Sequence, residues 1–162
     1  MKQTRKKLPA VRQLIGSTDR IDFPDFGLAD VAAKVDTGAY TSALHCTDVQ
    51  LVPTGDRHQL RFTIVAGPAN QRRRLSADIF KYKTIKNSFG QSEKRFVVQT
   101  RVRILGRTIR AEFSLADRGR MRFPVLLGRK LLRNKFVVDV SLKDVSYKLK
   151  NRASDPLGGH QP

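Results

Sequence analysis

The sequence predicts an all-β domain with one short helix. Apolar and polar residues alternate with a period of two, most clearly over Leu60 to Ile64, Val98 to Ile104 and Ile109 to Leu115. This period places apolar side chains on one face of a strand. Turn signals such as Pro53-Thr54-Gly55-Asp56 separate the stretches. A helical pattern appears after Gly128, over roughly residues 130–134.

Short strands separated by loops are expected in the first half of the chain. Val11 to Ile15 is an apolar run, and the loop that follows it is rich in acidic residues and contains Pro24. An apolar strand over residues 31–35 then ends at Asp36. The chain continues with strand-like pieces and a Gly-Pro turn, at 42–46, 49–52, 60–64 and 67–70.

Two hairpins are expected in the second half. The first covers residues 79–97 and has Asn87-Ser88-Phe89-Gly90 at its tip. The second reverses at Leu105-Gly106-Arg107 and carries basic residues along its solvent-facing side. Strands over 136–140 and 145–149 are expected to close the domain.

One domain is expected from the length of 162 residues and the mass of 18.3 kDa. We place it at residues 11–150, after a basic flexible N-terminus at 1–10 and before a disordered tail at 151–162. The single Cys46 cannot form an internal disulfide, so no oxidising compartment is implied. No apolar run has the length of a signal peptide or a membrane span, so a cytoplasmic protein with no membrane partner is expected.

Positive charge dominates the composition. Lys and Arg number 32 and Asp and Glu 14, which gives a net charge of +18 and a pI near 11.0. A polyanionic partner and a merely solvated basic surface both fit this excess. Nucleic acid is the less favoured partner, because the chain has no Trp and only three Tyr to stack on bases. The basic residues concentrate in two stretches, 72–110 and 118–135.

The most informative motif is Asp36-Thr37-Gly38, which follows an apolar strand directly. This is how an aspartic protease presents a catalytic carboxylate. The chemistry requires two carboxylates that share a proton, one as general base and one as hydrogen-bond donor. No second Asp-Thr/Ser-Gly occurs, so the partner carboxylate is expected from a second copy of the chain. The alternative is a simple turn in which Asp36 caps nearby backbone amides.

A second motif, Val125 to Leu132, follows about ninety residues later and contains Leu126-Leu127-Gly128-Arg129. Together with Asp36-Thr37-Gly38-Ala39, it resembles the retropepsin-like aspartic proteases. The resemblance implies the acid-protease fold, a closed β-barrel with one short helix. From about Val31 to Val140 the chain is also similar to a bacterial family labelled ATP-dependent zinc protease, which is associated with the ligase that adds glutamates to a ribosomal protein.

Neither part of that label fits the residues. The histidines are His45, His58 and His160, and no His-Glu-x-x-His pair is present. His45 and Cys46 are adjacent on an expected strand, so their side chains would point to opposite faces. The chain also lacks a phosphate-binding loop of the Gly-x-x-x-x-Gly-Lys-Ser/Thr type. We therefore expect no metal and no cofactor.

The resemblance assigns catalytic roles to three residues. Asp36 would share a single proton with Asp36 of the partner, since two such close carboxylates cannot both ionise. Thr37 would hydrogen-bond across the dimer, and Gly38 would permit the turn and donate toward the carboxylates. The substrate-binding residues carried over are Ala39, Asn87, Ser88, Gly90, Gly128 and Arg129.

Alternatives stand beside these assignments. The tip at Asn87 to Gly90 would be a flap over the substrate, or a simple hairpin. Gly128 would pack behind the catalytic turn, or belong to ordinary core. The position after Ala39 is Tyr40, where viral-type proteases commonly have an Asp that pairs with the Arg of the second motif. Arg129 therefore lacks that acidic partner.

The expected function is an aspartic endopeptidase that hydrolyses peptide bonds as a homodimer. Acidic or glutamate-rich peptides are the expected substrates, because a basic cleft would concentrate them. The alternative is a catalytically inactive module of the same fold that uses its basic surface to bind RNA or an acidic protein.

Overall fold

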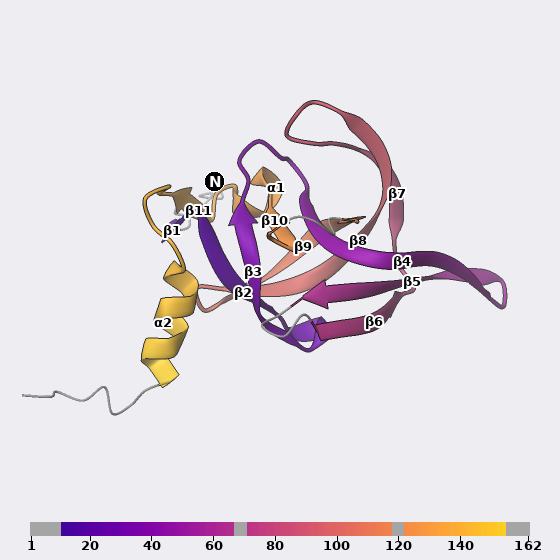
Figure 1. Cartoon of the computed structure of the whole chain (residues 1–162), viewed down its shortest axis with the longest axis horizontal. Helices are drawn as coiled ribbons and strands as arrows, with labels where there is room; N and C mark the ends of the chain where they lie inside the picture. The colour runs from indigo at the N-terminus through magenta and orange to yellow at the C-terminus, as the bar shows by residue number, and fades with distance from the viewer. Residues whose placement is uncertain (1–10, 67–70, 118–121, 155–162) are drawn as a thin grey trace, which may run out of the picture.

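The computed structural model describes residues 11–66, 71–117 and 122–154 (Figure 1). Strands dominate it, as the sequence predicts, and they are joined by a 3-10 turn and two α-helices. In chain order the elements are β1 (Gln13–Ile15), β2 (Thr18–Phe23), the 3-10 turn (Pro24–Phe26), β3 (Leu28–Val35), β4 (Ser42–Thr54), β5 (Arg57–Ala66), β6 (Gln71–Ala77), β7 (Lys81–Lys86), β8 (Ser92–Ile104), β9 (Arg107–Ala116), β10 (Val125–Leu127), α1 (Arg129–Leu132), β11 (Phe136–Val138) and α2 (Val145–Ser154).

The main sheet is mixed and returns to its first strand. Its order is β10-β3-β2-β8-β9-β4-β5-β6, and β10 also pairs with β4. The strands β10, β3, β2, β8, β9 and β4 therefore form a ring, from which β5 and β6 extend. β10 is parallel to β3 and antiparallel to β4, so it joins the two strands that flank the Asp36 loop.

The core fills the inside of this curved sheet. Its largest fully buried side chains include Phe23, Phe62 and Phe113, and the Phe23 and Phe113 rings meet edge to face with centroids 5.4 Å apart. Burial alternates along β8, where Val98, Thr100, Val102 and Ile104 are covered while the residues between them are exposed. The two-residue period of the sequence thus selects the face that each strand buries.

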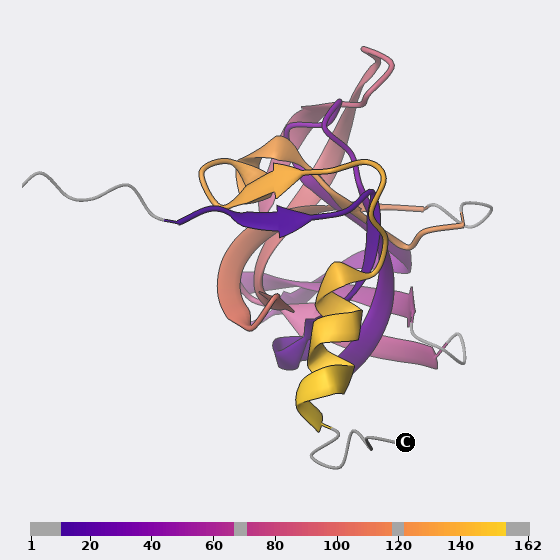
Figure 2. The same ribbon diagram turned by 90° about the vertical axis from the view of Figure 1, so that its left-hand side faces the viewer.

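The prediction of a strand over residues 145–149 is wrong, and so is the prediction of a single helix. This segment begins α2, which extends to Ser154 and lies along β2 (Figure 2). The buried Asp19 carboxylate accepts hydrogen bonds from the backbone N–H groups of Ser146 (2.9 Å) and Tyr147 (3.1 Å). Two of the amides that a helix start leaves unpaired are therefore capped by a residue more than a hundred positions away.

Burial raises the pKa of Asp19, while its three backbone N–H donors act in the opposite direction. A buried carboxylate needs such donors to remain tolerable. Because the cap is tertiary, the local pattern of α2 does not reveal the helix.

Several other boundaries differ from the predictions. β4 is one strand rather than two, with an irregularity between Thr47 and Gln50. β6 is absent from the predictions, because its first four residues are all polar and show no alternation of apolar and polar side chains. The strand is held by its pairing with β5. The helix predicted at residues 130–134 is observed as α1, Arg129–Leu132. The predicted turn at 67–70 lies outside the described residues.

Candidate active site

Asp36 follows β3 immediately, at the end of the ring where the tip of the β7–β8 hairpin also lies (Figures 1 and 2). β10 pairs with β3 in parallel, with Val35 opposite Leu127. The Asp36 N–H extends this pairing by donating to the Leu127 carbonyl at 2.9 Å. The two sequence motifs are therefore adjacent in space, and the second one supports the backbone of the first.

Gly128 lets α1 approach the Asp36 loop closely. A Cβ atom at this position would lie 2.7 Å from the carbonyl oxygen of Tyr40 and 3.0 Å from that of Ala39. The same two carbonyls accept hydrogen bonds from the N–H groups of Lys130 (3.0 Å) and Arg129 (2.8 Å). The loop thus satisfies free amides at the start of α1, and only a residue without a side chain fits between them.

Arg129 has partners other than an acidic side chain. Its Nη1 donates to the Thr37 carbonyl oxygen at 2.9 Å, and its guanidinium lies 5.9 Å from the centre of the Tyr40 ring. The aromatic residue that replaces the acid of the viral-type motif thus contacts the same arginine by a cation–π interaction. Arg129 braces the loop within one chain.

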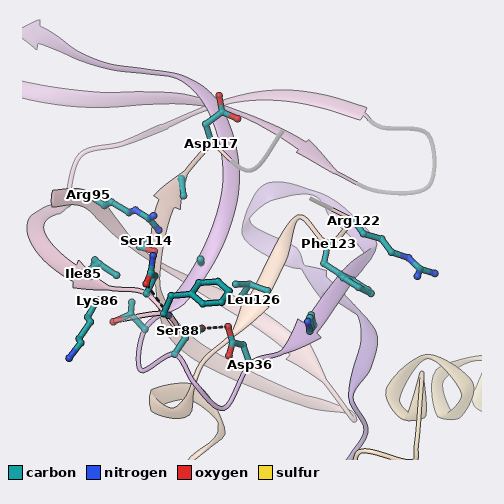
Figure 3. A pocket seen from close by; sticks show the side chains of 17 residues that line it. Asp36, Ile85, Lys86, Ser88, Arg95, Ser114, Asp117, Arg122, Phe123 and Leu126 are labelled. Atoms are coloured by element: carbon teal, nitrogen blue, oxygen red, sulfur yellow. Dashed lines mark hydrogen bonds between the residues drawn. The ribbon is translucent and has the colours of Figure 1, made fainter. Parts of the chain in front are cut away.

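Each oxygen of the Asp36 carboxylate accepts a hydrogen bond. Oδ1 accepts from the Gly38 N–H at 3.0 Å, and Oδ2 accepts from the Ser88 hydroxyl at 2.6 Å (Figure 3). A Cβ on Gly38 would lie 3.2 Å from the Ser88 Cβ, so the hairpin tip is in close contact with the Asp36 loop. The tip therefore covers the carboxylate, as a closed flap would.

The tip itself is held by Asn87. Its Oδ1 accepts from the N–H groups of Phe89 and Gln91, both at 3.0 Å. Gly90 adopts a φ of 83°, a left-handed conformation that glycine tolerates best. Phe89 is 91% exposed at the end of the hairpin, where a large apolar side chain has nothing to cover it within the described residues.

Glu112 ties the base of this hairpin to α1. Its carboxylate forms ion pairs with Lys81 (3.0 Å), Lys83 (3.3 Å) and Lys130 (2.9 Å). Hydrogen bonds from Lys130 and Lys81 hold the pKa of Glu112 at about 2, well below its ordinary value. The pairs link β7, β9 and α1 around the site.

A cleft of about 580 Å³ opens beside Asp36 (Figure 3). Four cationic residues and two acidic residues line it, together with the apolar side chains of Ile85, Phe89, Phe123 and Leu126. The cations are Lys34, Lys86, Arg95 and Arg122, and the acids are Asp36 and Asp117. The cleft therefore has apolar side chains in its lining and a positive balance of charge.

Four of the residues predicted for the site line this cleft, namely Asp36, Ala39, Asn87 and Ser88. Thr37, Gly38, Gly90, Gly128 and Arg129 contribute to the loop, the hairpin tip or the support behind them. The sequence assignment omitted Arg95 and Arg122. For Arg95 the signal available was its alternation with Lys94, which places the two side chains on opposite faces of the strand.

Among the described residues, no three His, Cys, Asp or Glu side chains lie close enough together to bind a zinc ion. His45 faces Asp117, with Nδ1 3.8 Å from Oδ1. Cys46 is buried, and burial raises its pKa to about 12, far from the thiolate form that metals bind.

Comparison with known proteins places these features in a family. The RimB-like family, described as the retropepsin-like aspartic endopeptidase RimB, matches residues 14–148. The solved structure of Lpg0085, a protein of unknown function (DUF785) from Legionella pneumophila, superposes with a TM-score of 0.69 at 22% identity and covers 84% of this chain and 99% of that one. This second likeness concerns the fold alone.

Curated relatives carry a similar segment within longer chains. The probable alpha-L-glutamate ligase of Desulfotalea psychrophila is 30% identical over 134 residues, which are 82% of this chain and 29% of that protein. The protein of the same name from Shewanella pealeana is 30% identical over 132 residues, 79% of this chain and 28% of its own length. The chain thus spans less than a third of these relatives.

Proposed function

Because the chain belongs to the RimB-like family of retropepsin-like aspartic endopeptidases, we propose that it hydrolyses peptide bonds through a pair of Asp36 carboxylates formed by homodimerisation. The observation that carries the proposal is the Asp36 carboxylate itself. It lies in the cleft, on a loop braced by Gly128 and Arg129 and under a hairpin tip. The ring of strands is our basis for assigning the closed β-barrel of the acid proteases.

The reaction uses a water molecule between the two carboxylates. The ionised Asp36 removes a proton from this water, whose oxygen attacks the peptide carbonyl carbon. The protonated Asp36 of the second copy donates a hydrogen bond to the carbonyl oxygen, where negative charge develops. Proton transfer to the amide nitrogen then accompanies cleavage of the C–N bond, which yields a carboxylic acid and an amine.

A second copy is needed because one chain supplies one carboxylate to this loop. The other acid of the cleft, Asp117, lies at the far end of the cleft from Asp36 in Figure 3. Thr37 and Gly38 are exposed, and Tyr40 is 52% exposed, so the loop is open to a symmetric partner. An isologous contact would bring identical loops together on a two-fold axis.

Acidic peptides, including glutamate-rich ones, are the proposed substrates. The cleft carries four cations against two acids, one of which is the catalytic carboxylate. Relatives in which a similar segment is part of a longer protein are named as probable glutamate ligases. A glutamate polymer is a substrate that a ligase of this name would produce and a basic cleft would attract.

The central test replaces Asp36 by Asn, which keeps the shape and removes the ionisable group. Wild type should cleave a fluorogenic glutamate-rich peptide, and Asp36→Asn should lose at least ~10³-fold in kcat/KM. The matched control is Asp56→Asn, an exposed acid in the β4–β5 turn, which should behave as wild type. Binding without cleavage in both wild type and Asp36→Asn would instead support the inactive binding module.

Mixing the two proteins tests the dyad. After subunit exchange, a heterodimer in which one copy carries the Asp36→Asn substitution is inactive, so activity should fall as the square of the wild-type fraction. If each chain acts alone, activity should instead fall linearly with the wild-type fraction. A linear plot, at concentrations where light scattering shows dimers, would refute the shared site.

A further inference from the structure

Arg95 lies on the face of the β7–β8 hairpin that looks into the cleft. Register pairs it with Lys83 on β7, while Glu93 is paired with Ile85, which is buried and lines the cleft. Neighbouring Lys94 points to the opposite face, where its ammonium lies 5.9 Å from the Tyr82 ring. Figure 3 shows the Arg95 guanidinium turned into the cleft toward Ser114.

Two other cations of the cleft, Lys86 and Arg122, are oriented differently. Figure 3 shows the charged ends of Lys86 and Arg122 turned away from the space between Arg95 and Asp36. Among the labelled cations, Arg95 alone directs its charge into the cavity. It comes from the same hairpin as Ser88, whose hydroxyl contacts the catalytic carboxylate.

The guanidinium is largely covered but poorly paired. The Arg95 side chain is 17% exposed, and its Nη2 donates to the Glu93 carboxylate at 2.9 Å. Its Nε is buried and has no hydrogen-bond partner among the described residues. A guanidinium has five N–H donors, so within the described part of the chain the bond to Glu93 leaves most of them without an acceptor.

Such an arrangement is unfavourable for folding alone. A buried charged group with an unpaired donor destabilises the native state, and an apolar residue of similar volume is often neutral or stabilising. The chain nevertheless places an arginine in a cleft that Ile85 and other apolar side chains also line. The unused donors point to a ligand with acceptor oxygens.

We infer that Arg95 determines specificity by binding the side-chain carboxylate of an acidic substrate residue next to the scissile bond. The inference deepens the proposed function and rests on it. The planar fork of arginine matches a carboxylate with two parallel hydrogen bonds, which a lysine cannot make. The carboxylate of Glu93, whose side chain is 67% exposed, already pairs with one edge of the Arg95 guanidinium.

The test compares paired peptides that differ by Glu or Gln at the positions flanking the cleaved bond. In wild type, the kcat/KM ratio should favour the Glu peptide. Arg95→Gln should reduce this ratio by at least about tenfold, because charge-assisted hydrogen bonds are lost. Arg95→Lys should retain part of the preference for the Glu peptide.

Lys94→Gln is the matched control. It removes the same charge from the same hairpin but from the opposite face, so the ratio should stay close to wild type. A similar loss in both variants would mean that the general field of the hairpin, and not a contact at Arg95, sets the preference, and would overturn the inference.

Thermal unfolding separates a ligand role from a structural one. Arg95→Met should have a Tm equal to or above that of wild type, since the orphaned donor is removed. If the Tm of both Arg95→Met and Arg95→Gln falls by several degrees while the Glu-to-Gln ratio is kept, the arginine is structural and the inference is wrong.

Binding measurements keep the inference independent of catalysis. In the Asp36→Asn background, fluorescence anisotropy with labelled Glu and Gln peptides should show the same Arg95-dependent preference. If wild type cleaves neither peptide but this binding preference is present, the proposed protease activity is refuted and the carboxylate site at Arg95 is supported. If cleavage depends on Asp36 but neither assay responds to Arg95, the carboxylate site is refuted and the protease activity is supported.

Discussion

Substitution of Gly128 by Ala should disturb the fold and the site together. The added Cβ would lie 2.7 Å from the Tyr40 carbonyl oxygen, whereas carbon–oxygen contacts are normally about 3.3 Å or longer. The 128–130 segment and the Asp36 loop must then separate by about 0.6 Å. Both sides are held by hydrogen bonds between Arg129, Lys130 and the loop carbonyls, so neither moves freely.

The size of the effect follows from overpacking. Insertion of one methyl group into a tight backbone contact costs about 2 kcal/mol, which corresponds to a fall in Tm of about 4 to 8 °C in a domain of this size. Displacement of the loop that carries Asp36 should also reduce kcat/KM by about tenfold or more, because catalytic geometry tolerates little movement. Calorimetry and peptide cleavage well below the Tm measure the two effects separately.

Gly106→Ala is the control for this experiment. Gly106 lies in the β8–β9 turn with a φ of 73°, and a Cβ there would meet no atom within 4 Å. Left-handed strain alone should cost about 1 kcal/mol and leave cleavage per folded molecule unchanged. A Tm for Gly128→Ala that equals wild type, or a loss of activity that is equally large in Gly106→Ala, would refute the reasoning.

Three other perturbations test separate features of the structure. Glu112→Gln removes the anion shared by three lysines and should lower the free energy of unfolding at pH 7 by about 1 to 2 kcal/mol, after allowance for the partial exposure of the lysines. Because the folded pKa of Glu112 is about 2, this contribution to stability is present above the ordinary pKa of a glutamate and is lost as the pH falls toward 2. In urea unfolding, the difference in stability between wild type and variant should therefore be smaller at pH 2 than at pH 7. An equal difference at the two pH values would contradict the ion pairs. A Gly38→Cys/Ser88→Cys variant should form an internal disulfide that peptide mapping detects, because the two Cβ positions are 3.2 Å apart and need to separate by only a few tenths of an ångström to reach the roughly 3.5 to 4.5 Å of a disulfide. A Gly38→Cys/Ser92→Cys variant should not form one. Failure of the first pair to oxidise would mean that the hairpin tip does not rest on the loop. Asp19→Ala removes the cap of α2 and should cost about 1 to 2 kcal/mol, seen as faster hydrogen exchange at the first amides of the helix, and unchanged exchange would show that the cap is unimportant.

The hairpin tip shows which features can be predicted from the sequence and which cannot. A tip at Asn87 to Gly90 is predictable, because Asn, Ser and Gly close together in the sequence are typical of a turn and specify a local reversal. Contact between Ser88 and Asp36 is not predictable from that pattern, since it depends on the curvature of β7 and β8 around the ring. The prediction of a flap came from the family resemblance. The hydrogen bond from Ser88 to Asp36 is the contact by which the tip lies against the loop.

Local chemistry by itself determined the alternating strands and the turn that follows Asp36. Side-chain alternation and turn residues act over a few positions, so they can be read directly from the chain. Tertiary structure alone decided that Asp19 caps α2 and that Arg95 enters the cleft with an Nε that has no partner among the residues the structure describes. These features depend on which distant segments pack together, and that packing is set by the ring as a whole rather than by any one segment.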